Sequence, residues 1–70
     1  MTEEYIASLE ARFALFSKTQ LQEYMGASNL RLARYNITLR SIPQNEFLKL
    51  TADRLALKIR IARAEFMRRI

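Results

Sequence analysis

The chain contains no cysteine, no histidine and no tryptophan, and it has one glycine and one proline among its 70 residues. Without cysteine there is no disulfide, no thiolate metal ligand and no thiol nucleophile. Without histidine, the commonest general base and metal ligand is missing. The seven carboxylates alone do not form an acid–base or metal-binding pattern that we can place. The sequence therefore predicts a protein that is not an enzyme and that holds no metal or cofactor.

Long hydrophobic runs are also absent. No stretch approaches the ~20 apolar residues that span a membrane. The first four residues include two glutamates, which is unlike a signal peptide. We therefore expect a cytoplasmic protein with no membrane partner.

The remaining composition favours helices. Half of the residues are hydrophobic and 27% are charged, with little glycine or proline, which is typical of an all-α chain. We predict one domain over residues 1–70. A domain of this size buries only about 60% of its unfolded surface, so we also expect self-association to stabilise it.

The charge is distributed unevenly. Residues 1–16 have three glutamates against one arginine, residues 17–42 have four cations against one glutamate, and residues 43–70 have seven cations against three acids. The net charge is +5. A basic body of this kind indicates a polyanionic partner or an acidic protein, although a solvated helical surface would also account for it.

Capping residues divide the first half of the chain into three short predicted helices. Thr2 caps a helix over residues 3–16. Ser17 and Gln20 have the spacing of a capping box, so a second helix begins at residue 18 and ends at Gly26. Ser28 caps a third helix over residues 29–35.

The second half of the chain is predicted as an extended connector and one long helix. Apolar and polar residues alternate over residues 37–42, and Pro43 closes this segment. Residues 44–70 contain no glycine or proline and read as a helix, with a possible break at Thr51. Residues 55–61 also alternate as a strand would, but the alanines and charged residues around them favour helix.

Residues 18–35 resemble a helix-turn-helix DNA-binding unit. Counted from Lys18, the pattern requires particular residue types at the fourth, fifth, eighth, ninth, tenth, fifteenth and eighteenth positions. These fall on Leu21, Gln22, Met25, Gly26, Ala27, Leu32 and Tyr35. Gly26 would allow the tight turn and the apolar residues would fix the angle between the helices. Gln22 departs from the pattern, which has alanine or glycine at that position because the two helices nearly touch there.

This resemblance implies a small transcriptional regulator of the phage, plasmid or bacterial type that binds double-stranded DNA through the 28–35 helix. Arg31 would contact guanine and Asn29 adenine, because their side chains form paired hydrogen bonds with those bases. The full set of implied DNA-binding residues is Thr19, Gln20, Ser28, Asn29, Arg31 and Arg34. Ser28 would lie at a helix start suited to a phosphate, and Thr19 and Gln20 would touch the DNA backbone.

The last helix is predicted to form a homodimer interface. Its apolar residues repeat at alternating spacings of four and three, which is typical of a seam between two helices. The interface residues are Leu48, Leu55, Ile59, Ala62 and Phe66. Pairing of the 37–42 segment across a two-fold axis is the alternative dimer interface.

A second function stays open at this point. The chain could be a helical protein–protein interaction module, such as an inhibitor, an adaptor or an antitoxin-like subunit, whose basic surface faces an acidic protein. Affinity for DNA duplex that falls steeply with salt would distinguish the first function from the second.

Overall fold

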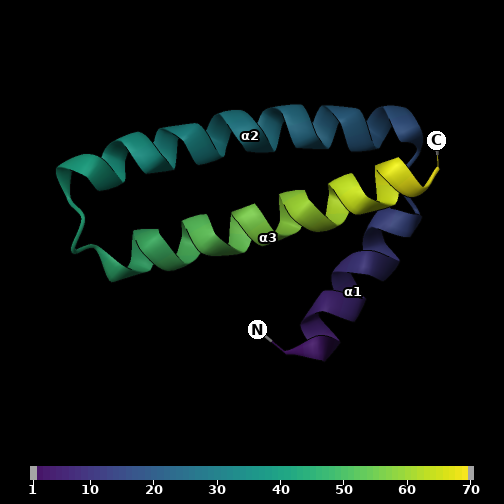
Figure 1. Ribbon diagram of the computed structural model, residues 1–70, viewed down its shortest axis with the longest axis horizontal. Helices are drawn as coiled ribbons and strands as arrows, with labels where there is room; N and C mark the ends of the chain where they lie inside the picture. The colour runs from purple at the N-terminus through teal and green to yellow at the C-terminus, as the bar shows by residue number, and fades with distance from the viewer. Residues whose placement is uncertain (1, 70) are drawn as a thin grey trace.

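The computed structural model describes residues 2–69, and this part of the chain is helical with no strand. The three helices are α1 (Glu3–Ala14), α2 (Lys18–Ser41) and α3 (Glu46–Arg68). Helices α2 and α3 form an antiparallel hairpin, and α1 lies along the C-terminal half of α3 (Figure 1). The prediction of an all-α protein is confirmed; the predicted end of the last helix at Ile70 lies outside the described residues.

Each helix begins at a polar residue that accepts a hydrogen bond from the first turn. The Thr2 hydroxyl accepts from the Tyr5 amide at 3.2 Å, and the Asn45 carboxamide oxygen accepts from the Leu48 amide at 3.0 Å. Ser17 and Gln20 form the predicted capping box, with N···O distances of 3.0 and 2.7 Å. These bonds satisfy amides that have no partner inside a helix.

The turn predicted at Gly26 is wrong, because α2 continues through it without a break. No glycine or other residue in the described chain has a positive φ. The two short helices predicted over residues 18–25 and 29–35 are therefore parts of one helix. The helix-turn-helix bundle of three short helices is replaced by a helical hairpin and one shorter helix.

The extended connector predicted over residues 37–42 is also wrong. Residues 37–41 belong to α2, and the Thr38 hydroxyl donates to the Arg34 carbonyl at 3.0 Å, inside the helix. Leu39 is half-buried while Ile37 is 62% exposed. Their alternation separates two sides of a helix rather than two faces of a strand. The interhelical connection is limited to residues 42–45.

The long C-terminal helix is confirmed, and it is not interrupted at Thr51. The Thr51 hydroxyl donates to the Phe47 carbonyl at 2.9 Å, so it lies within the helix and caps nothing. Residues 55–61 are helical as preferred. Their strand-like alternation arises because α3 is covered by α2 on one side and by α1 on another.

Two matching apolar patterns hold the hairpin together. Buried or half-buried residues repeat at alternating spacings of four and three along both helices. In α2 they are Leu21, Met25, Ser28, Leu32, Tyr35 and Leu39, and in α3 they are Leu48, Ala52, Leu55, Ile59, Ala62 and Phe66. The repeat is that of an antiparallel two-helix seam. Its small residues at Ser28, Ala52 and Ala62 allow the helices to approach closely.

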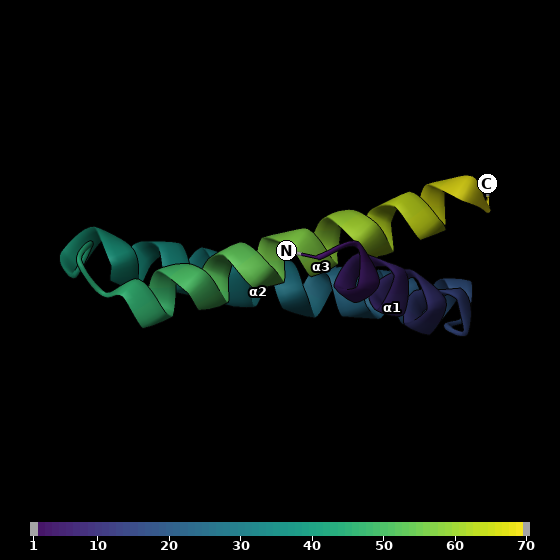
Figure 2. The same cartoon turned by 90° about the horizontal axis from the view of Figure 1, so that it is seen from below.

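The densest packing lies where the C-terminal end of α1 crosses the hairpin. Leu9 and Phe13 of α1 are buried with Leu21 of α2 and Ala62 of α3. The Phe13 ring lies 5.3 Å from Phe16 and 5.0 Å from Tyr24, measured between ring centroids. The molecule is otherwise thin, with extents of 38 × 25 × 14 Å, and its helices lie in little more than one layer (Figure 2).

Candidate nucleic-acid interface

The residues predicted to bind DNA do not converge on one surface. Thr19 and Gln20 are exposed in the first turn of α2, and the Gln20 side chain is engaged in the capping box. Arg34 lies fourteen residues further along the same helix than Gln20, which corresponds to about 21 Å. These residues therefore cannot form the compact contact that a helix-turn-helix makes.

Ser28 and Asn29 are also placed differently from the prediction. Ser28 is 4% exposed, because it lies on the side of α2 that packs against α3. Since it is inside a continuous helix, it does not stand at a helix start with free amides for a phosphate. Asn29 is exposed but lies nearly half a turn around the helix from Arg31.

Arg31 and Arg34 remain exposed, and α3 adds two further cations beside them. Tyr24 packs against Phe13, which marks the side of the hairpin that the end of α1 crosses. Arg31 lies seven residues after Tyr24, close to two helical turns, and is therefore on the same side. Arg34 follows one turn later on the adjoining flank of α2.

On α3, Glu65 marks the same side, because Arg69 bonds both Glu65 and carbonyls at the end of α1. Lys58 lies seven residues before Glu65, and Arg54 lies one turn before Lys58. Arg34 is seven residues before the end of α2, and Arg54 is eight residues after the start of α3. The antiparallel hairpin therefore places Arg31 and Arg34 of α2 beside the two cations of α3. We call these four residues, Arg31, Arg34, Arg54 and Lys58, the basic face.

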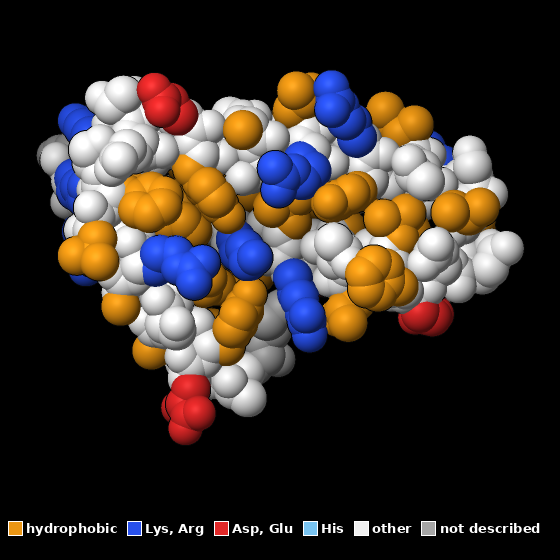
Figure 3. All heavy atoms as spheres, turned by 180° about the vertical axis from the view of Figure 1, so that it is seen from behind, with side chains coloured by type: hydrophobic (Ala, Val, Ile, Leu, Met, Phe, Trp, Pro, Cys, Tyr) orange, Lys and Arg blue, Asp and Glu red, His pale blue; other side chains and the backbone are white. Residues whose placement is uncertain are grey.

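None of the four cations of the basic face takes part in an ion pair. Among residues 2–69, the ion pairs join Glu65 to Arg68 and to Arg69. Figure 3 shows a face of the molecule on which Lys and Arg side chains lie among hydrophobic ones, with acidic side chains at its edges. The basic face is thus a positive surface without ion-pair partners among residues 2–69, and the sequence alone did not place the cations of α3 beside Arg31 and Arg34.

Glu65 holds its two arginines in a structural role. The side-chain hydrogen bond from Arg68 is the main cause that lowers the pKa of Glu65 below its ordinary value, with a further contribution from Arg69. Burial of the carboxylate opposes this shift. Arg69 also donates to the carbonyls of Phe13 and Ala14 at 3.1 and 3.0 Å, and to that of Phe16. The Phe13 carbonyl also accepts a hydrogen bond from the Phe16 amide at 3.1 Å, so the bonds from Arg69 add to the backbone bonds at the end of α1.

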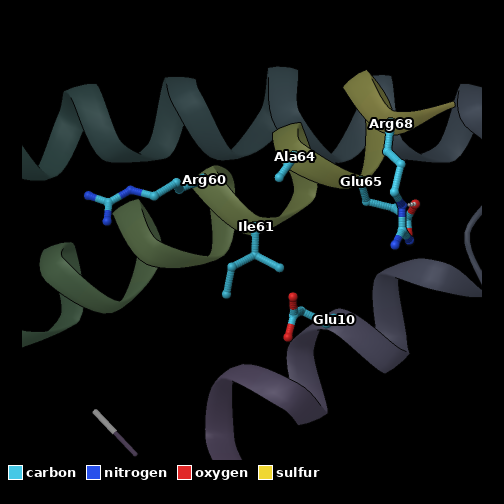
Figure 4. Close-up of a pocket in the computed structure, with 6 residues that line it drawn as sticks. All are labelled: Glu10, Arg60, Ile61, Ala64, Glu65 and Arg68. Atoms are coloured by element: carbon cyan, nitrogen blue, oxygen red, sulfur yellow. Dashed lines mark hydrogen bonds and ion pairs between the residues drawn. The ribbon is translucent and has the colours of Figure 1, made fainter. Parts of the chain in front are cut away.

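A shallow groove lies between α1 and α3 (Figure 4). Its lining residues are Glu10, Arg60, Ile61, Ala64, Glu65 and Arg68. Glu10 points from α1 toward α3, while Glu65 and Arg68 pair with each other. The groove contains charges of both signs. In the part of the chain that the structure describes, no group of three or more metal-ligating side chains is present.

The predicted dimer residues of α3 pack within the chain. Leu55 and Ala62 are buried, and Leu48, Ile59 and Phe66 are half-buried. All five belong to the seam that faces α2, and the Lys18 ammonium lies 5.7 Å from the centre of the Phe66 ring. A second chain could reach this seam only if the hairpin opened.

Comparison with known proteins does not assign the chain to a family. No protein-family model, no curated protein and no solved structure matches the chain. None of the helices within residues 2–69 is long and apolar enough to cross a membrane.

Proposed function

We propose that the protein binds double-stranded DNA through the basic face, mainly by contacts to phosphates. The observation that carries this proposal is the placement of Arg31, Arg34, Arg54 and Lys58 on one side of the hairpin without an acidic partner. DNA carries one negative charge per ~1.7 Å of its axis, and each cation that neutralises a phosphate releases a condensed counterion. Packed helices lie about 8–10 Å apart, so the four cations are close enough to contact neighbouring phosphates.

This proposal changes the mode of binding expected from the helix-turn-helix resemblance. A recognition helix needs one free side and several polar residues that reach base edges. Along residues 28–35 of α2, Ser28 is buried and Asn29 faces away from Arg31. Phosphate contacts position a protein on the duplex but carry no direct sequence information. We therefore propose binding that tolerates many sequences, and regulation of transcription would require a further source of specificity.

Fluorescence anisotropy with a labelled random duplex of ~20 base pairs tests the proposal. The double variant Arg31→Gln with Arg34→Gln should bind at least ~10-fold more weakly than the wild type, because two phosphate contacts are lost. The control is Lys49→Gln with Arg63→Gln, which removes the same charge from another side of α3 and should weaken binding much less. Equal losses in both double variants would show that net charge and not the basic face is responsible.

Exposed apolar side chains favour a second candidate, a protein–protein interaction module. Phe47 lies seven residues before Arg54 and is 80% exposed, and Leu50 is 48% exposed. Aromatic and arginine side chains together are typical of protein interfaces, and an acidic protein would complement them. The same assay separates the two functions. A module that binds only proteins would not bind duplex at moderate salt. If the chain does bind DNA, Phe47→Ala should leave that binding unchanged, because Phe47 is not part of the basic face.

A further inference from the structure

Helix α2 has a second apolar face that nothing in the chain covers. We call it the outer face, and its four central residues are Gly26, Leu30, Ala33 and Ile37. They repeat at spacings of four, three and four, which places them on one side of the helix. Leu30 is 56% exposed and Ile37 is 62% exposed. No atom outside the local helix backbone lies within 4 Å of the position that a Cβ on Gly26 would occupy.

The outer face lies opposite the seam with α3. The seam residues of α2, such as Leu21 and Ser28, are buried, whereas the outer-face residues stand about half a turn away from them. An amphipathic helix on a protein surface normally carries polar residues there. Leucine and isoleucine repeated at this spacing therefore indicate a surface that packs against another helix.

We propose that a second copy of this chain covers the outer face, with the two α2 helices antiparallel about a two-fold axis. Small and large residues alternate along the face, so an antiparallel copy places a large residue opposite a small one in every layer. Ile37 packs over the partner's Gly26, and Leu30 packs over the partner's Ala33. Each pair occurs twice by symmetry, as in an isologous interface.

Charge at the ends of the face supports the same occupant and the same orientation. Glu23 and Arg40 continue the repeat by one step at either end, and both are exposed. In the antiparallel dimer Glu23 lies opposite the partner's Arg40 at both ends. A parallel dimer would instead place Glu23 beside Glu23 and Arg40 beside Arg40. Repulsion between these like charges disfavours the parallel dimer.

The dimer also affects the proposed DNA binding, and this consequence rests on the proposed function. The two-fold axis of an antiparallel helix pair is perpendicular to the plane that contains the two helices. Rotation about it reverses the helix direction but leaves each flank on the same side of that plane. The basic faces of both copies therefore point in the same direction and form one surface of doubled charge.

A charge-exchange experiment with sedimentation velocity tests the interface. The wild type should sediment as a dimer at ~100 µM. The variants Glu23→Arg and Arg40→Glu should each dimerise roughly 10-fold more weakly, because each places like charges opposite one another. An equimolar mixture of the two variants should recover dimers, since Glu23→Arg then faces Arg40→Glu. A wild-type mass of one chain at this concentration, or a mixture no better than the single variants, overturns the proposal.

Disulfide cross-linking determines the register, because the chain has no cysteine of its own. Gly26→Cys and Ile37→Cys chains should cross-link only when they are mixed. Each alone should stay uncross-linked, because eleven helical residues separate positions 26 and 37 by ~16 Å, beyond disulfide reach. Arg63→Cys mixed with Gly26→Cys is the background control. Cross-linking of Gly26→Cys with itself would establish a parallel dimer and overturn the proposed arrangement.

Neither experiment depends on DNA. If the chain dimerises as proposed but does not bind duplex, the proposed function fails and the dimer stands. If it binds duplex as a monomer, the dimer fails and the proposed function stands.

Discussion

At the scale of single residues, Arg69 makes the most consequential polar contacts in the molecule. It links the last turn of α3 to the C-terminal end of α1, more than fifty residues away in sequence. A cation is favourable at the negative end of a helix dipole, and the hydrogen bonds of Arg69 add to the backbone bond that the Phe13 carbonyl already accepts. One side chain therefore fixes where α1 ends against the hairpin.

We expect Arg69→Ala to lower the free energy of unfolding by about 1.5–3 kcal/mol, the usual range for hydrogen bonds to a charged group. Urea denaturation followed by circular dichroism measures this change. Arg68→Ala is the matched control, because Arg68 pairs with Glu65 but bonds no carbonyl of α1. A loss as large for Arg68 as for Arg69 would show that the ion pairs with Glu65, and not the bonds to α1, stabilise this corner.

Glu65 gives this corner a dependence on pH. The hydrogen bond from Arg68 lowers the pKa of Glu65 in the folded state. The unfolded chain therefore binds a proton at higher pH than the folded chain does. The stabilising contribution is complete above the unfolded pKa, near pH 4.3, and is lost as pH falls through the lower folded pKa.

Thermal unfolding of the wild type and of Glu65→Gln, measured between pH 2.5 and 7, tests this contribution. The wild type should exceed the variant in stability at pH 7, and the difference should shrink below about pH 4. Asp53→Asn is the control, since Asp53 is exposed and forms no ion pair in the described structure. A difference that stays constant across the pH range would exclude ionisation of Glu65 as its cause.

At the scale of helices, the sequence predicted the first two beginnings correctly but divided α2 by a false ending at Gly26 and a false beginning at Ser28. Thr2 and Ser17 cap helices as expected, because the capping bonds are made within a few residues. Gly26 and Ser28 were misread because local signals for a turn competed with a longer apolar repeat. That repeat runs from Leu21 to Leu39 without interruption, and burial against α3 stabilises the continuous helix more than one glycine weakens it.

The same competition explains the error over residues 37–42. Alternation of Ile37 and Leu39 over so few residues is compatible with a strand and with a helix that has apolar residues on two sides. Only the full length of α2 resolves the ambiguity. The basic face could not be predicted for a related reason, since its contribution from α3 depends on the hairpin register.

Substitution of Gly26 tests the continuity of α2 directly. Gly26→Ala should raise the free energy of unfolding by about 0.5–1 kcal/mol, because alanine favours the helix and the added methyl group meets open space. Ala33→Gly, the reverse change on the same face, should lower it by a similar amount. Both are measured at low micromolar concentration, where dimerisation contributes little. Destabilisation by Gly26→Ala would instead indicate a backbone that needs glycine, as a turn would.

At the scale of the whole molecule, the thin shape explains why so much apolar surface stays exposed. A single layer of helices has a small interior, and buried hydrophobic side chains concentrate where three helices meet. The remainder of the hairpin has only two helices, so Leu30, Ile37 and Phe47 find no cover within the chain. Self-association was expected from the size of the chain, but the proposed interface moves from α3 to α2, because the apolar seam of α3 is already occupied.

The dimer and the basic face together predict how DNA binding responds to salt. The logarithm of the binding constant falls with the logarithm of salt concentration, with a slope of about −0.9 for each phosphate contacted. If one chain provides four contacts, a dimer that binds with both basic faces should show a slope of roughly −7, and a monomer roughly −4.

Ile37→Asn carries no charge change and should produce the monomer, because a polar side chain then faces the partner's Gly26. Leu15→Asn is the control, since Leu15 is 87% exposed and lies outside α2, and it should keep the steep slope. Anisotropy titrations between 50 and 300 mM salt measure both variants. An unchanged slope for Ile37→Asn would mean that a single chain provides all the phosphate contacts, whereas a slope near zero for the wild type would show that the basic face does not bind DNA.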